Sequence, residues 1–306
     1  MVSRIGGNSV AAPRVGIVVV EYRDRDGARR ITAQAPPSVP VVVVSAGPIR
    51  FGDDSDRAIV VHLPTNPGFG AAANQGIKTL PPDVTHALVC NTDIVMQADT
   101  ASRLAREASV GSLGLLSPVL VAPDGRAEWN GGHVDFLRLS VVHEGIGRPI
   151  KPTTGVRNTE FVTAACVLIC RAAWMAVSGF REDLFLYSED VDLSLRLRSL
   201  GWRLGVAQNI TVTHHRSGTV GVLSPLQLYL MTRNGIRIFS EWGERWWSRV
   251  ACWVVVPVRL AFRTLRKRPL GWSQLIWIAR GTWDARVASP FRTGKGRSPM
   301  QTIDRA

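Results

Sequence analysis

The most informative segment of the chain reads Phe185-Leu-Tyr-Ser-Glu189-Asp190-Val-Asp192-Leu-Ser-Leu-Arg-Leu-Arg-Ser-Leu-Gly201-Trp202. Three carboxylates, those of Glu189, Asp190 and Asp192, fall within four positions directly after an apolar and aromatic run. Like charges at such short range disfavour joint ionisation, so the cluster costs free energy that a simple helix start does not require. We therefore expect the acids at the entry to a helix, in a site that needs a base beside a cation.

The residues after the acids predict a helix and then a return to the sheet. A helix is expected over residues 191–200, with leucines along one face and Gly201 as its stop. Residues 203–206 and 210–213 have the pattern of strands and would bring His214 back to the sheet edge. A histidine is a good ligand for Mn²⁺-like ions, although a lone histidine is more often a surface or core residue.

Upstream of this segment, β-branched runs alternate with helix-like stretches. Strands are predicted at residues 15–20, 39–44, 58–62, 85–90 and 161–170, helices at residues 70–80, 100–108 and 172–177, and an apolar run at residues 113–121. Glycine and proline punctuate residues 138–157, so we expect a loop over the site there. Buried strands in alternation with helices are typical of a mainly parallel sheet in an α/β domain.

A glycine-rich turn separates the third strand from its helix and reads Asn66-Pro67-Gly68-Phe69-Gly70-Ala-Ala-Ala-Asn74-Gln75-Gly76. Glycines permit a tight turn, and the backbone N–H groups at the start of a helix favour a phosphate or the edge of a nucleotide. Glycine-rich turns of this kind are also common where no ligand binds. The segment alone therefore leaves a binding role and a structural role equally open.

The fourth strand ends in a candidate metal motif, Cys90-Asn91-Thr92-Asp93. Open α/β sheets bind their ligands at the carboxyl ends of the strands. Hard divalent cations such as Mg²⁺ and Mn²⁺ prefer oxygen ligands and accept substrate phosphates in their coordination shell. Asp93 is a candidate ligand with Asn91 as its neutral companion, whereas the competing interpretation is an ordinary turn.

The composition limits the class of protein. A chain of 306 residues suits one large α/β domain with an extension, or two small domains. The net charge of +13 is uneven, because residues 237–297 hold 13 basic and three acidic side chains. The four cysteines show neither metal-binding nor paired spacing, and no signal peptide is evident, so reduced thiols and a cytoplasmic location are expected. The apolar run at residues 250–258 is too short to span a bilayer.

Seven of the ten tryptophans also lie in the C-terminal region. Trp favours the bilayer interface and Arg favours anionic lipids, so helical segments near residues 246–263 and 270–280 are expected to lie on an anionic membrane surface. The competing interpretation is that the tryptophans pack the tail against the body while the arginines stay solvated. Basic and aromatic residues also mark nucleic-acid-binding proteins, but no such motif accompanies them, so no nucleic-acid partner is expected.

The order of the motifs resembles that of the inverting family 2 glycosyltransferases of GT-A fold, in particular the rhamnosyltransferase-like branch. The matching segments are Asn66-Pro-Gly68-Phe-Gly70, Asn74-Gln-Gly76, Asn91-Thr-Asp93, Pro123-Asp-Gly125, Gly179-Phe180, Phe185-Leu-Tyr-Ser-Glu189-Asp190-Val-Asp192-Leu, Gly201-Trp202, His214-His215 and Arg233-Asn234. The resemblance implies a GT-A catalytic domain over residues 1–240, with a Rossmann-like, mixed and mainly parallel sheet between helices. It also implies a basic, Trp-rich helical extension over residues 241–306.

The resemblance further implies a role for each acid and for the histidine. Asp93 and His214 would bind Mg²⁺ or Mn²⁺, which counters the charge of the diphosphate leaving group. Asp190 would be the general base that deprotonates the acceptor hydroxyl, with Glu189 and Asp192 positioning the base or the acceptor. Asp192 has the alternative role of a helix cap. The nucleotide-sugar would contact a larger set, namely Tyr22, Asn66, Gly68, Phe69, Asn74, Asn91 and Asp93.

Two positions depart from the family pattern. Ser45-Ala46-Gly47 follows the second strand, where relatives commonly have Val-Asp-Asn and the Asp reads the nucleobase. The first strand ends in Glu21-Tyr22-Arg23 in place of the usual Thr-Tyr-Asn. The donor is therefore left open between thymidine and uridine diphosphate sugars.

The function expected from the resemblance is metal-dependent transfer of a sugar, rhamnose or similar, with inversion. The acceptor would be a hydroxyl of a cell-envelope glycan or of a lipid-linked sugar, in cell-wall and polysaccharide biosynthesis, at the inner face of the cell membrane. The alternative is a non-catalytic, membrane-associated protein that kept the fold. Such a protein would be expected to lose one of Asp93, Asp190 and His214, yet all three are present.

Overall fold

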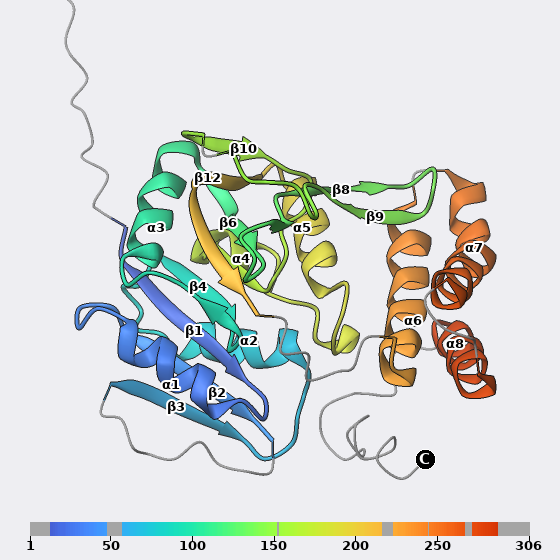
Figure 1. The fold of residues 1–306 in the computed structure, drawn as a ribbon, viewed down its shortest axis with the longest axis horizontal. Coiled ribbons are helices and arrows are strands. Elements are labelled where there is room, and N and C mark those ends of the chain that lie inside the picture. Colours follow the sequence, from blue (N-terminus) through green and yellow to red (C-terminus); the bar gives the residue numbers. More distant parts are fainter. Residues whose placement is uncertain are drawn as a thin grey trace, which may run out of the picture.

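A computed structural model describes residues 13–47, 57–151, 153–215, 223–243, 245–266 and 271–286, with only the backbone of residues 110 and 111. Its centre is a mixed sheet with the strand order β10-β12-β6-β11-β4-β1-β2-β3 (Figure 1). The strands on this path are β1 (Val15–Glu21), β2 (Val41–Ala46), β3 (Ala58–Leu63), β4 (His86–Asn91), β6 (Leu113–Val121), β10 (Val156–Asn158), β11 (Cys166–Cys170) and β12 (Arg203–His214). Two short strands, β5 (Ile94–Val95) and β7 (Ala127–Trp129), pair with β12 and β6.

The parallel half of the sheet consists of β3, β2, β1 and β4, and β11 joins it antiparallel between β4 and β6. The β-branched runs form these strands because both faces of the sheet are covered, so the side chains of β1, β2, β4 and β11 are mostly buried, while those of the edge strand β3 are only partly buried. Val18, Val43 and Leu88 have no accessible surface. The predicted α/β fold with a mixed, mainly parallel sheet is confirmed.

Helices cover both faces of this sheet. They are α1 (Arg25–Gln34), α2 (Phe69–Thr79), α3 (Thr100–Gly111), α4 (Arg171–Ala176) and α5 (Glu189–Ser199). Ile17 of β1 lies with Ile31 of α1 and Ala101 of α3 on one face. The next residue, Val18, contacts α2 at Gly76 on the other face, as the alternation of side chains along a strand requires.

The structure corrects two local predictions. Only Cys166–Cys170 of the long strand expected at residues 161–170 is a strand, because the backbone before it turns aside to contact Asn91 and Asp190. The expected loop at residues 138–157 contains β9 (Ser140–His143), which forms a hairpin with β8 (Gly132–Asp135), and most of β10. The hairpin turn is stabilised by Asp135, whose Oδ1 accepts hydrogen bonds from the N–H groups of residues 137 and 138.

The C-terminal part is helical, as predicted, and consists of α6 (Pro225–Trp242), α7 (Trp246–Leu265) and α8 (Trp272–Asp284). Ser224 caps α6 by accepting a hydrogen bond from the N–H of Gln227, and Pro225 occupies the first turn. Helix α6 continues across residue 240, the expected domain boundary, and packs against both α7 and α8. Among the helices described by the structure, none has the length and apolar character needed to cross a membrane.

Candidate active site

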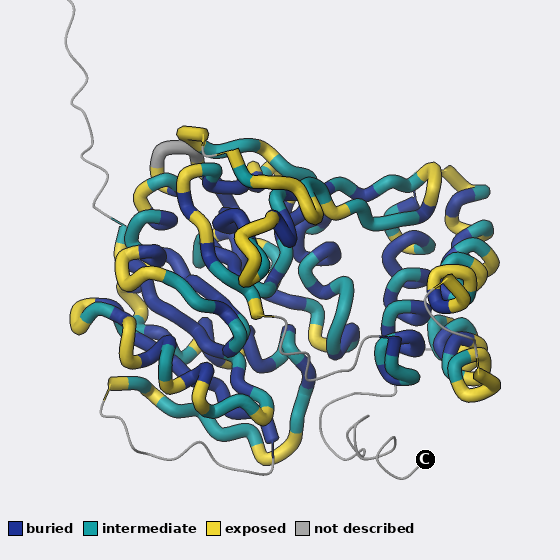
Figure 2. The backbone as a smooth tube through the Cα atoms, viewed as in Figure 1, coloured by how far each residue is buried: buried dark blue, intermediate teal, exposed yellow. Residues whose placement is uncertain are grey.

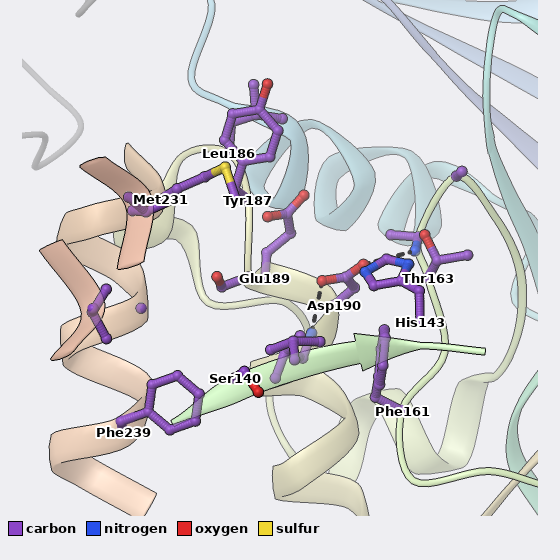
Figure 3. A pocket seen from close by; sticks show the side chains of 18 of the residues that line it. Ser140, His143, Phe161, Thr163, Leu186, Tyr187, Glu189, Asp190, Met231 and Phe239 are labelled. Atoms are coloured by element: carbon purple, nitrogen blue, oxygen red, sulfur yellow. Dashed lines mark hydrogen bonds between the residues drawn. The ribbon is translucent and has the colours of Figure 1, made fainter. Parts of the chain in front are cut away.

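A pocket of about 510 Å³ lies where the sheet meets the C-terminal helices. Its polar wall includes Asn91 at the end of β4, Thr163 in the turn before β11, and Glu189 and Asp190 in the first turn of α5. The β8–β9 hairpin supplies His143, and α6 and α7 supply an apolar wall opposite. Figure 3 shows the Glu189 and Asp190 carboxylates inside this pocket, with Met231 and Phe239 of α6 nearby. Glu189, Asp190 and Asn91 are therefore brought together in one pocket.

Asp190 is held by two backbone donors. Its Oδ1 accepts a hydrogen bond from the N–H of Val191 at 2.8 Å, and its Oδ2 accepts one from the N–H of Ala164 at 3.3 Å. Burial raises the pKa of Asp190, while the charge of His143 and the two backbone donors oppose part of this rise. Figure 3 shows the His143 imidazole beside the carboxylate. A carboxylate whose pKa is raised towards neutrality is a better general base than an exposed one.

Glu189 is the other acid in the pocket. Burial raises its pKa well above the usual range, and the neighbouring charge of Asp190 raises it further. Glu189 in turn contributes to the raised pKa of Tyr187, which burial chiefly brings to about 12. Two adjacent acids in one buried site cannot both ionise at low cost, so the pair favours one shared proton.

Asp192 does not reach the pocket. Its side chain is only 1% exposed and accepts a hydrogen bond from Nε of Arg196 at 2.7 Å. Nη1 of Arg181 lies 3.5 Å from its other oxygen. Arg196 also donates to the carbonyls of Val177 and Gly179, so Asp192 ties α5 to the segment before it. This position does not support the catalytic role that the sequence suggested for Asp192.

The segment that leads to the acids has an unusual backbone. Phe185, Tyr187 and Ser188 have φ values of 66°, 68° and 68°, a region that non-glycine residues seldom adopt. Such conformations persist only where surrounding contacts impose them, and they gather at functional sites. We call residues 184–188 the acid loop.

Helix α6 holds the acid loop in this conformation. Nδ2 of Asn234 donates to the carbonyls of Leu184, Leu186 and Tyr187 at 2.9, 2.9 and 2.7 Å. Arg233 donates to the carbonyl of Leu184 at 2.8 Å, and both side chains are completely buried. The Arg233-Asn234 pair therefore fixes the backbone that presents Glu189 and Asp190.

The glycine-rich turn packs against the acid loop from the other side. Oδ1 of Asn66 accepts a hydrogen bond from the N–H of Gly68, and Phe69 donates its N–H to the carbonyl of Phe185. Gly68 has a φ of 95°, and a Cβ there would lie 2.3 Å from that same carbonyl oxygen. Glycine is therefore required at this position, and Phe69 lines the pocket.

Five residues expected to bind the nucleotide-sugar lie outside the pocket lining, namely Tyr22, Asn66, Gly68, Asn74 and Asp93. Asn74 is buried and bonds to the backbone of Phe180 and to Nε1 of Trp174, so it joins α2 to the segment before the acid loop. Tyr22 follows β1 and lies beside Gly47, at the carboxyl end of the parallel strands. That edge is where an open α/β sheet binds a ligand, so the position of Tyr22 agrees with a contact to the nucleotide.

The two departures from the family pattern contact each other. Glu21 and Ser45 are neighbours in the register of β1 and β2, and both are buried. Oγ of Ser45 donates a hydrogen bond of 2.7 Å to Oε2 of Glu21, whose Oε1 accepts from the N–H of Asp24. The changes therefore form one hydrogen-bonded unit at the carboxyl end of the parallel strands.

The predicted metal ligands Asp93 and His214 are brought together. The pairing of β5 with β12 places His214 opposite Ile94, and its Nε2 lies 3.3 Å from Oδ1 of Asp93. Nδ1 of His214 lies 2.8 Å from Oε1 of Glu128 in β7. Burial lowers the pKa of His214, but the hydrogen bonds and charges of Asp93 and Glu128 outweigh it and raise the pKa to about 9.

Asp93 and His214 could supply some of the ligands of a divalent cation. Within the described ranges, no group of three or more His, Cys, Asp or Glu side chains has a metal-binding arrangement. A carboxylate oxygen and an imidazole nitrogen are suitable donors for Mn²⁺, and diphosphate oxygens and water commonly complete such a shell. A carboxylate on the second ring nitrogen, as with Glu128, is the usual partner of a metal-binding histidine and directs Nε2 to the ligand.

Several residues of the site were not identified from the sequence. Glu128 and His143 come from the short strands β7 and β9, and neither has a characteristic spacing from the acids. Predicting these two residues would require knowing how β7 and β9 pair with other strands. A local sequence pattern does not contain that information. Arg233 and Asn234 were singled out by resemblance alone, without a role.

Comparison with known proteins agrees with this geometry. No family model matches the chain. The chain is 26% identical over 241 residues to the N-acetylglucosaminyl-diphospho-decaprenol L-rhamnosyltransferases of two Mycobacterium tuberculosis strains, covering 68% of this chain and 78% of theirs. It is 30% identical over 143 residues to the O-antigen biosynthesis protein RfbC of Myxococcus xanthus, covering 43% of this chain and 11% of that protein.

Solved structures share the fold. GalNAc-T7, crystallised with UDP, GalNAc and Mn²⁺, superposes with a TM-score of 0.61 at 11% identity and covers 92% of this chain, which spans 56% of that one. Residues 1–349 of S. aureus TarS superpose with a TM-score of 0.52 at 14% identity, covering 89% of this chain and 80% of that one. With the motif order and the pocket, the sequence relatives support a rhamnosyltransferase-like glycosyltransferase of family 2, and the solved structures show that the chain shares the GT-A fold.

Proposed function

We propose that the protein transfers a sugar, rhamnose or similar, from a nucleoside-diphosphate donor to a hydroxyl of a cell-envelope glycan or lipid-linked acceptor. The observation that carries the proposal is Asp190, a carboxylate with a raised pKa inside the pocket, in a fold that also brings Asp93 and His214 together. Similarity to a rhamnosyltransferase and to an O-antigen biosynthesis protein supports the class of sugar and of acceptor.

Asp190 acts as the general base in this proposal. Its carboxylate accepts the proton of the acceptor hydroxyl as the acceptor oxygen bonds to the anomeric carbon of the sugar. The bond between that carbon and the diphosphate oxygen breaks at the same time, so the configuration inverts. The backbone N–H groups of Val191 and Ala164 orient the carboxylate, and the neighbouring Glu189 keeps the pair at one proton.

Asp93 and His214 hold the leaving group in this proposal. A divalent cation between them and the diphosphate would neutralise the charge that develops as the diphosphate leaves. Nε2 of His214 would hold the cation as part of a neutral imidazole, and Glu128 would keep the proton on Nδ1. The Mn²⁺ and UDP of the GalNAc-T7 structure support this choice of cofactor and of donor type.

The apolar wall of the pocket supports a lipid-linked acceptor. Leu139, Phe161, Met231 and Leu260 line the pocket together with the two acids, and Arg263 lies in the same lining. An acceptor with a polyprenyl chain and a diphosphate would place its chain against the apolar side chains and its charge near the arginine. Because such an acceptor stays in the bilayer, we also propose that the protein works at the cytoplasmic face of the cell membrane.

The first test is a thermal-shift panel of UDP, TDP, GDP and their common sugars, with and without Mn²⁺. A ligand that binds only the folded state raises the melting temperature, so one nucleoside is expected to give a rise that depends on Mn²⁺. Asp93→Asn should lose the Mn²⁺ dependence, whereas Asp99→Asn, an exposed acid outside the site, should keep it. No shift with any nucleotide would indicate that the Glu21–Ser45 unit has abolished donor binding and would contradict the proposal.

A further inference from the structure

The outer side of α7 carries a row of exposed apolar side chains. We define the α7 row as Trp246, Val250, Val254, Val258, Phe262 and Leu265, each between 55% and 79% exposed. The first five follow one another at intervals of four residues, which places them along one side of the helix. An apolar row of this length on a surface helix indicates a contact with something outside the described part of the chain.

The α7 row is not needed for packing within the protein. A second series at intervals of four, Ser248, Cys252, Val256, Leu260 and Thr264, is buried. Cys252 of this series contacts the carbonyl of Ile236 in α6, so the series marks the side of α7 that faces the protein. The two series are offset by two residues, about 200° around a helix, so the α7 row points away from the core.

Helix α8 extends the exposed apolar surface. Trp272, Ile276 and Trp283 are 83%, 61% and 66% exposed. Figure 1 places α7 and α8 together at the end of the molecule opposite strands β1–β3, and Figure 2 shows exposed positions at intervals on both helices. Both helices therefore present apolar side chains at one end of the molecule.

The charges around the α7 row identify its partner as anionic. Arg249 follows a member of the buried series and Arg263 precedes one, so each lies about 100° from that series, on opposite flanks of the α7 row. Arg245 lies on the flank of Arg249, whereas Arg259, on the flank of Arg263, donates to the carbonyls of Arg138 and Leu139 and is not counted among the flanking arginines. Within α7 and α8, Asp284 is the single acid, and it bonds to Tyr229 and Arg280. Apolar side chains between arginines, with tryptophans at the helix start, are typical of a helix that lies in an anionic membrane interface.

We propose that α7 lies along an anionic phospholipid bilayer, with the α7 row inserted below the headgroups and the flanking arginines on the lipid phosphates. Val256, Arg259, Leu260 and Arg263 of the same helix line the pocket, so the helix that docks on the bilayer also forms one wall of the pocket. The inference deepens the proposed function, on which it rests for the lipid-linked acceptor. Lipid binding itself requires no sugar transfer and is measured without a donor.

The test is co-sedimentation of the full chain with vesicles of phosphatidylcholine, with and without phosphatidylglycerol. The test variant carries Val254→Gln and Val258→Gln, which remove apolar surface from the α7 row without changing the charge. The control carries Met175→Gln and Leu200→Gln, at residues 64% and 58% exposed on the catalytic domain, against 65% and 61% for the two valines. We expect the test variant to partition about tenfold more weakly into anionic vesicles, while the control matches the wild type.

Four outcomes would overturn the inference. They are absence of wild-type binding, equal binding to neutral and anionic vesicles, equal weakening by the test and control variants, and a lipid-free dimer in sedimentation equilibrium that the test variant dissociates. The last outcome would assign the α7 row to a second copy of the chain. Transfer to a short-chain, water-soluble acceptor should be unchanged in the test variant, so loss of lipid binding with transfer retained leaves the proposed function intact.

Discussion

Asp190 and Glu189 line the same pocket, but their hydrogen bonds with the backbone differ. Asp190 accepts hydrogen bonds from two backbone N–H groups outside its own residue, which favour its charged form. The pKa of Glu189 is raised well above its usual range, chiefly by burial. Of the two, Asp190 is therefore the acid that ionises, and Glu189 is the one that stays protonated.

This difference predicts that Glu189→Gln stabilises the protein at neutral and alkaline pH. A carboxyl whose folded-state pKa is raised contributes its full stability below the unfolded value of 4.5 and loses it as the pH rises towards the folded pKa. Glutamine does not ionise, so the melting temperature of the variant should exceed that of the wild type increasingly above pH 4.5. Asp26→Asn, at a side chain 94% exposed, is the control and should show no such trend. A lower melting temperature for the glutamine variant across the whole range would refute the assignment.

Which side chains a sequence can reveal depends on where their partners lie. The crowding of Glu189, Asp190 and Asp192 is local, so the sequence predicted the helix entry that carries them. Whether each acid faces the pocket depends on Arg181 and Arg196, which remove Asp192 from it. His143 and Glu128 lie on strands that are distant in sequence from Glu189 and Asp190, so no local sequence pattern predicts that they belong to the site.

Helix α6 determines the shape of the acid loop. Its Asn234 and Arg233 make five of the backbone contacts that hold residues 183–187, where φ is positive at Phe185 and Tyr187. The glycine-rich turn closes the loop from the other side through Phe69. The catalytic acids thus depend on an element that follows the sheet in the chain and belongs by packing to the C-terminal helices.

Asn234→Ala should therefore reduce sugar transfer more than its effect on stability explains. The change removes the Asn234 donor from the carbonyls of Leu186 and Tyr187, while Leu184 keeps its bond from Arg233, and the loss costs about 1–3 kcal/mol in the free energy of unfolding. Thr232→Ala is the matched control, because Thr232 is equally buried in α6 but donates to Leu228 within the helix. Transfer is measured well below both melting temperatures. Equal turnover in the two variants would show that the Asn234 contacts do not position the acids.

At the level of elements, the buried strands were predictable because β-branched runs need both faces of a sheet covered. Residues 161–165 were predicted as strand for the same reason, yet they leave the sheet to contact Asn91 and Asp190. The β8–β9 hairpin was missed because the glycines and prolines that follow it, at residues 145–155, indicated a loop, although residues 132–143 contain one glycine and no proline. At residues 161–165 a long-range contact decided the conformation, and a pattern of neighbouring residues does not contain that contact.

The whole molecule combines a nearly neutral sheet domain with a basic helical end. Residues 237–297 hold most of the excess positive charge, and the α7 row lies within them. The pocket lies between these two parts and is lined by both. In this account the sugar donor binds on the side of the pocket formed by the sheet, and the acceptor enters on the side of the C-terminal helices. Asp190 lies between the two substrates.

The most direct test of this account is sugar transfer by Asp190→Asn, with the donor chosen by the thermal-shift panel. The amide keeps the size of the side chain but removes the base, so transfer should fall at least about a hundredfold. Binding of the nucleotide with Mn²⁺, measured by calorimetry, should stay unchanged, because Asp93 and His214 are intact. Transfer within a factor of a few of the wild-type rate, with binding retained, would contradict the account by removing Asp190 from the role of base.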